Sequence, residues 1–65
     1  MPEGTNRKDI QIGAKVQVIQ KQHQRSGELT EGIVKKRLTN SPNHPHGIKV
    51  MLADGIVGRV KIILE

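Results

Sequence analysis

The chain has 65 residues, with no cysteine and no Phe, Trp or Tyr. These absences exclude a disulfide framework, a zinc site built on cysteines and an aromatic platform that stacks the bases of single-stranded nucleic acid. Eleven Lys and Arg against six Asp and Glu give a formal net charge of +5 at pH 7. This excess favours a polyanionic partner, nucleic acid before an acidic membrane surface, over the alternative of a charge kept only for solubility.

The rest of the composition indicates the fold class of the protein and its cellular compartment. No apolar run is long enough to span a bilayer, and the N-terminus lacks the apolar region of a signal peptide. Together with the missing cysteines, this predicts a soluble cytoplasmic protein. Ile and Val dominate the apolar residues, and β-branched side chains favour strands over helices. The expected class is all-β.

Residues 1–8 are polar and show no periodicity, so we expect them to form a mobile arm. A single small domain then spans residues 9–65. Apolar residues alternate from Ala14 to Val18, which is typical of a half-buried strand. Residues 19–27 are mostly polar and favour an exposed loop.

Residues 28–38 form the second expected strand, but its apolar pattern is inconsistent. Every second residue of a strand faces the same side. If Gly32, Val34 and Leu38 face the core, Lys36 would face it as well. A bend or bulge near Gly32 would relieve the conflict, because glycine inside a strand often marks one.

Residues 48–60 predict a hairpin whose register follows from its turn. A two-residue turn would mix apolar and charged residues on both faces, whereas a three-residue loop of residues 53–55, with Gly55 left-handed in a bulge, separates them. The inner pairs are then Leu52 with Ile56, Val50 with Gly58 and Ile48 with Val60, and the outer pairs are Met51 with Val57, Lys49 with Arg59 and Gly47 with Lys61. Facing like charges are tolerated when they are solvated or neutralised, and a bound anion is one such neutraliser.

The loop of residues 39–47 contains two prolines that stiffen it. It is either a preorganised rim that hydrogen-bonds a phosphate or a partner's backbone, or a tight connection whose polar groups satisfy their own backbone. The candidate rim residues are Asn40, Ser41, His44 and His46.

These histidines are a weak basis for a metal site. His44 and His46 could be joined by His23, but no cysteine and no nearby carboxylate completes a tetrahedral set. We therefore expect no metal and no other cofactor. The chain also lacks a cysteine nucleophile and is too short to enclose a water-free pocket, so we expect neither enzymatic activity nor a small-molecule substrate.

Four short strands with glycine-marked turns, and a fifth if residues 61–64 form one, predict a small SH3-like barrel of strongly bent antiparallel strands. The order of the glycine and apolar positions resembles the KOW-type modules of ribosomal and transcription proteins. That resemblance implies the barrel and favours nucleic-acid binding.

Without aromatic side chains, binding is expected to use phosphates and 2′-hydroxyls of structured RNA, or the backbone of a duplex. The candidate binding residues are Lys35, Arg37, Lys49, Arg59 and Lys61. The alternative function is a protein-interaction adaptor that uses an exposed edge strand or a patch of Met51 and Val57. Neither function involves a membrane.

Motifs along nearly the whole chain resemble the uncharacterised YwbE family of small bacterial and archaeal proteins. The family motifs are Asn-Arg-Lys-Asp-Ile at 6–10, Gln-Arg-Ser-Gly at 24–27, Leu-Thr-Asn-Ser-Pro at 38–42, His-Pro-His-Gly-Ile-Lys-Val at 44–50 and Gly-Arg-Val at 58–60. The resemblance implies a stand-alone cytoplasmic domain of unknown function.

Overall fold

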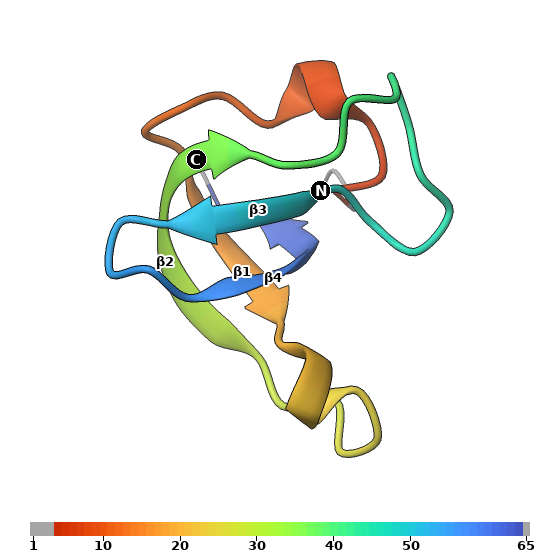
Figure 1. Ribbon diagram of the computed structural model, residues 1–65, viewed down its shortest axis with the longest axis vertical. Helices are drawn as coiled ribbons and strands as arrows, with labels where there is room; N and C mark the ends of the chain where they lie inside the picture. Colours follow the sequence, from red (N-terminus) through yellow and green to blue (C-terminus); the bar gives the residue numbers. More distant parts are fainter. Residues whose placement is uncertain (1–3, 65) are drawn as a thin grey trace.

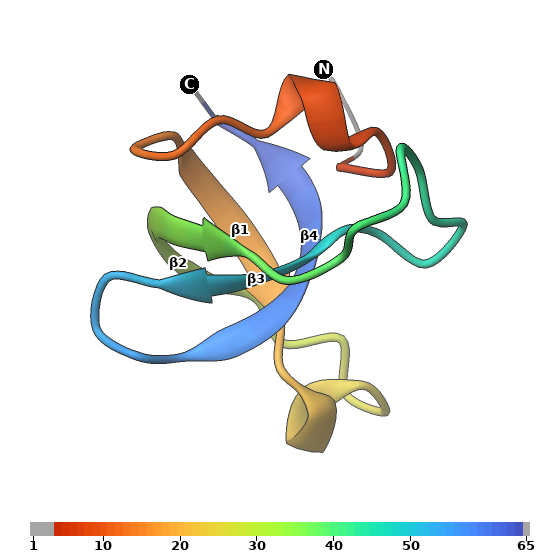
Figure 2. The same cartoon turned by 45° about the horizontal axis from the view of Figure 1, so that its top comes forward.

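The computed structural model describes residues 4–64, which fold into a small barrel. Its strands are β1 (Lys15–Ile19), β2 (Thr30–Arg37), β3 (Lys49–Leu52) and β4 (Val57–Ile63). Each strand pairs antiparallel with its neighbours, and β4 returns to β1, so the sheet closes on itself (Figure 1, Figure 2). The predicted all-β barrel is confirmed, with residues 61–63 continuing β4 instead of forming a fifth strand.

Only two short 3-10 turns accompany the strands in the described part of the chain, η1 (Arg7–Asp9) and η2 (Lys21–His23). The turn η2 lies within the long connection from β1 to β2, which projects from one end of the barrel (Figure 1). Within residues 4–64, no helix is long and apolar enough to cross a membrane.

The barrel interior is filled by aliphatic side chains alone. All four strands contribute, together with the segments that precede β1 and β3; the buried side chains are Ile10, Val16, Val18, Val34, Ile48, Val50, Leu52, Val60 and Ile63. Among the described residues, no polar or charged side chain is buried. The core therefore uses none of the described basic residues, and their charged groups remain near the surface.

The β3–β4 hairpin has the predicted register. Lys49 is paired with Arg59 and Met51 with Val57. Gly55 has a φ of 90°, as the predicted three-residue loop requires. With this register, the hairpin has an apolar inner face and a basic outer face.

Strand β2 avoids burying a lysine through a register shift between Val34 and Lys36, which leaves Lys35 as the extra residue. Beyond the shift, Lys36 is paired with Met51 and remains exposed. A regular strand would have directed Lys36 toward the core, where an unpaired ammonium group is costly.

Gly32 has a different role from the predicted one. It is paired with Val16 in unbroken register with β1. Of the predicted bend or bulge near Gly32, the bulge is therefore not at Gly32 itself but between Val34 and Lys36. A Cβ atom on Gly32 would lie 2.6 Å from Cδ1 of Leu52. The missing side chain therefore makes room for a core leucine at the bend of β2.

Residues 4–8, which the sequence pattern assigns to a mobile arm, lie against the barrel. The carbonyl of Gly4 accepts a hydrogen bond of 2.8 Å from the backbone N–H of Ile48. Gly4 is buried, with a φ of 75° and no space for a Cβ atom beside β4. This packing corrects the expected boundary for residues 4–8, because long-range main-chain hydrogen bonds leave no periodic signal; residues 1–3 lie outside the described part of the chain.

Candidate nucleic-acid interface

Basic side chains gather on the outside of the β3–β4 hairpin. Arg59 of β4 is paired with Lys49 on one side and with Ile19 of β1 on the other. Directly paired residues of antiparallel strands project from the same face, so Arg59 lies in the middle of three strands. We call Lys49, Arg59 and Lys61, together with His46 of the adjoining loop, the outer basic face.

Arg59 is held in place by the loop that precedes β3. Its side chain is half-buried, and Nη1 donates a hydrogen bond of 3.0 Å to the carbonyl of Gly47. A guanidinium group carries five N–H donors, so this contact orients Arg59 while leaving further donors for a ligand. Lys49 and Lys61 are exposed and add positive charge without a fixed geometry.

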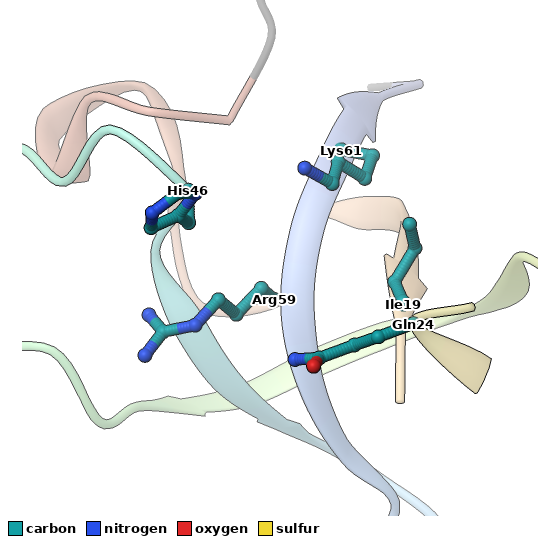
Figure 3. Close-up of a pocket in the computed structure, with 5 residues that line it drawn as sticks. All are labelled: Ile19, Gln24, His46, Arg59 and Lys61. Carbon is teal, nitrogen blue, oxygen red and sulfur yellow. The ribbon is translucent and has the colours of Figure 1, made fainter. Parts of the chain in front are cut away.

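An open hollow lies between these side chains. It is lined by Ile19, Gln24, His46, Arg59 and Lys61. Figure 3 shows Arg59 and Lys61 extending from β4, with the ammonium group of Lys61 turned toward the His46 ring. The hollow is therefore lined by the two cations of β4, by the imidazole of His46 from the loop before β3 and by the amide of Gln24 from the β1–β2 connection.

The β1–β2 connection is a part of the site that the sequence pattern does not reveal. A second hollow beside Arg59 and Lys49 is lined by Lys21, Gln22 and Gln24. No local motif assigns these residues to a site. Their position depends on the pairing of β1 with β4, which brings the end of β1 beside Arg59.

Within residues 4–64, no acidic residue adjoins the outer basic face in its hollows. The described residues that line the hollows around Arg59 and Lys61 carry no carboxylate. Within residues 4–64 the one ion pair is that of His23 Nε2 with Glu28 Oε2, at 3.2 Å. The positive charges of this face are therefore not neutralised by described acidic residues, which favours an external anion.

His46 of the outer basic face and the nearby His44 have different roles. The Nδ1 atom of His44 accepts a hydrogen bond of 3.1 Å from the backbone N–H of His46, and the two ring centroids lie 5.7 Å apart. Desolvation of half-buried His44 lowers its pKa below the ordinary value of 6.5, and the charges of Arg59 and His46 lower it further. His44 thus supports the loop, whereas exposed His46 lines the hollow.

The structure does not bring all five predicted basic residues together. Arg37 lies at another part of the surface, beside Arg7, and lines no hollow with Arg59. Lys35 is exposed at the register shift of β2 and lines none of the hollows described here. Of the five predicted binding residues, the outer basic face therefore contains Lys49, Arg59 and Lys61. The register shift in β2 places Lys35 and Arg37 elsewhere on the surface.

The predicted rim is divided in the same way. Asn40 lines the hollow beside Arg37, whereas His46 lines the hollow beside Arg59. Ser41 is exposed and lines neither hollow. Of the candidate metal ligands, His23 contacts Glu28, and within residues 4–64 no three His, Asp or Glu residues are grouped to hold a metal ion.

Comparisons with known proteins agree on the family of the chain. A family model described as "Uncharacterized conserved protein (DUF2196)" matches residues 3–63. The "Uncharacterized protein YwbE" of Bacillus subtilis (strain 168) is 50% identical over 62 residues, covering 95% of each chain. No solved structure matches this sequence. The resemblance read from the motifs is thereby confirmed, and the chain belongs to the DUF2196 family of uncharacterized conserved proteins.

Proposed function

We propose that this protein is a non-enzymatic module that binds structured RNA through its outer basic face. The observation that carries the proposal is the placement of Arg59 beside Lys49 and Lys61, at hollows whose described lining residues include cations and no carboxylate. The hydrogen bond from Arg59 to Gly47 orients one guanidinium group in advance, and an oriented guanidinium matches the geometry of a phosphate.

The side chains available restrict how the module can bind. The chain has no Phe, Trp or Tyr for base stacking, so contacts to phosphates and 2′-hydroxyls carry the affinity. Gln24 adds an amide that can donate to a hydroxyl or accept from one. We expect stronger binding to an RNA hairpin than to an unstructured strand of equal length, and little dependence on base sequence.

The alternative of a protein-interaction adaptor has less support. Closure of the barrel pairs all four described strands on both sides, which removes the edge strand that an adaptor could extend. Met51 and Val57 are paired on the outer side of the hairpin and are half-buried. Of the two surfaces predicted for an adaptor, the edge strand and this patch, the patch remains, so Met51→Ala with Val57→Ala is the variant that would reveal one.

The first experiment measures binding of a labelled RNA hairpin and a DNA duplex by fluorescence anisotropy between 50 and 200 mM salt. Three to five phosphate contacts on a duplex would weaken binding by roughly 40- to 500-fold over this range. The doubly substituted chain Lys49→Glu/Lys61→Glu is expected to bind roughly ten- to a hundredfold more weakly at 100 mM salt, because two phosphate contacts become repulsive.

The matched control is Lys15→Glu/Lys35→Glu, which makes the same change in net charge at residues that line none of the hollows. It should retain most of the affinity. Equal losses in both double variants would show that only net charge matters and would contradict the outer basic face. Absence of binding by the unaltered chain at 50 mM salt would overturn the proposed function, and Met51→Ala/Val57→Ala would then be tested for loss of a protein partner.

A further inference from the structure

A second group of basic residues lies where the N-terminal segment crosses the end of β2. Arg7, Lys8 and Arg37 line one hollow together with Asn6, Asn40 and Pro42. Arg7 and Lys8 are neighbours in the chain, and Arg37 lies about thirty positions away. We call Arg7, Lys8 and Arg37 the barrel-end cluster.

Arg7 is fixed by the loop between β2 and β3. Its backbone N–H donates to the carbonyl of Pro42 at 2.8 Å, and its Nε donates to the carbonyl of Thr39 at 3.0 Å. Arg7 is half-buried. The guanidinium group is therefore held at one end while its terminal nitrogens keep donors for another group.

Arg37 is placed by the register shift of β2. Beyond the shift it is paired with Val50, whose side chain is in the core, so Arg37 starts on the inner side of the sheet at the end of the barrel. Its Nη1 donates to the carbonyl of Ile10 at 3.3 Å. A second guanidinium group is thus anchored on main-chain oxygen beside the same hollow.

The charges of this hollow are unbalanced. Among the residues that the structure describes, its lining contains three cations and no carboxylate. Asp9 belongs to the same turn η1, but it lines a different hollow with Gln11 and Gly13. Three like charges around one hollow repel one another unless an anion lies between them, and two guanidinium groups with spare donors suit the oxygens of a phosphate.

A ridge of main-chain hydrogen bonds separates this cluster from the outer basic face. The backbone of residues 4–7 is joined to the loop of residues 39–48 by bonds from His44 to Thr5, at 2.9 Å, and from Ile48 to Gly4, at 2.8 Å. Thr5 lines a hollow with Lys61, and the next residue, Asn6, lines the hollow of the barrel-end cluster. The two basic groups therefore flank one ridge.

We propose that the barrel-end cluster is a second phosphate-binding subsite, which takes a further phosphate of the same RNA across the ridge from the outer basic face. The inference rests on the proposed function for the identity of the ligand. Capture of a phosphate by Arg7, Lys8 and Arg37 can be tested separately.

The first test is a titration with inorganic pyrophosphate followed by backbone amide NMR shifts, with sodium chloride of equal ionic strength as the reference. Saturable shifts are expected at residues 7, 8, 37 and 40, and they should be lost in Arg37→Gln. If these amides move no more with pyrophosphate than with chloride, the subsite does not exist. Shifts at residues 46, 59 and 61 report the outer basic face in the same spectra, so the failure of one site is distinguishable from that of the other.

The second test compares two single substitutions of exposed lysines, Lys8→Glu in the cluster and Lys35→Glu outside it. On the RNA hairpin, Lys8→Glu should weaken binding about tenfold and reduce the salt slope by about 1, because one phosphate contact is lost. Lys35→Glu should leave the slope unchanged. Equal slopes in both variants, with RNA binding intact, would overturn the subsite while the proposed function stands.

Discussion

The outer basic face and the barrel-end cluster use basic residues in different ways. On the outer basic face Lys49 and Arg59 are directly paired, and Lys61 is the extra residue at the register shift between β4 and β1. Both lysines are exposed, and among the described cations of this face only Arg59 is hydrogen-bonded to a carbonyl. In the barrel-end cluster both arginines are half-buried and each is bonded to a main-chain oxygen. Exposed lysines supply attraction over a distance, whereas anchored guanidinium groups supply direction and position.

The largest effect is expected from disturbing the ridge that both regions share. Gly47 has a φ of 102°, and a Cβ atom there would overlap the carbonyl oxygen of Val60. Gly47→Ala should therefore lower the free energy of unfolding by about 3 kcal/mol, through left-handed strain and the overlap together. Urea unfolding measures this change as a shift of the midpoint.

The control for this substitution is Gly13→Ala. Gly13 has a similar φ of 93° but no atom within 4 Å of a Cβ position, so only the backbone strain remains, at about 1 kcal/mol. Equal losses in the two variants would mean that the close approach of Gly47 to β4 does not matter for stability.

Exchanging arginine for lysine in the barrel-end cluster, and lysine for arginine on the outer basic face, tests whether the two regions differ in their need for a guanidinium group. Arg37→Lys keeps the charge but loses the planar fork, and we expect RNA affinity to fall about three- to tenfold with an unchanged salt slope. Lys61→Arg on the exposed strand should change affinity less than twofold, since its charge has no fixed geometry. Anisotropy titrations at two salt concentrations measure both affinities and both salt slopes. A larger change in affinity for Lys61→Arg than for Arg37→Lys would contradict the different roles given to exposed lysines and anchored arginines.

The smallest effect concerns pH and arises from His44, which adjoins the outer basic face. Because the pKa of His44 in the folded chain is below its ordinary value of 6.5, the unfolded chain takes up a proton first as pH falls through 6.5. The contribution of His44 to stability is thus present above pH 6.5 and decreases as pH falls toward the lowered pKa. Protonation also adds positive charge, so RNA binding should strengthen over the same interval.

The matched variant for this prediction is His44→Gln. It should flatten both pH profiles between pH 5 and 7, measured by urea unfolding and by anisotropy, with a change in affinity smaller than that of the two-lysine reversal. Profiles that keep their slope in the variant would assign the titration to another histidine.

The accuracy of the sequence-based predictions varied with the distance over which the chain must interact. In the hairpin, Gly55 and the alternation from Ile48 to Val60 lie within a few residues of one another, and the register was predicted correctly. In β2, the shift at Lys35 depends on the pairing with β3, and the prediction placed it near Gly32. The position of Arg37 followed from that shift, so the sequence pattern did not reveal that Arg37 lies apart from Lys49, Arg59 and Lys61.

Residue types and their spacing were enough to predict the all-β class, the hairpin register and a basic outer face with Lys49, Arg59 and Lys61. These features follow from β-branched composition, a period of two and a turn that requires positive φ, all of which are local. Three further features depend on the folded chain: residues 4–8 pack on the barrel, Gln24 and Lys21 adjoin Arg59, and Arg7 lines a hollow with Arg37. These contacts are made by main-chain hydrogen bonds and barrel closure between distant segments, which leave no periodic pattern in the chain.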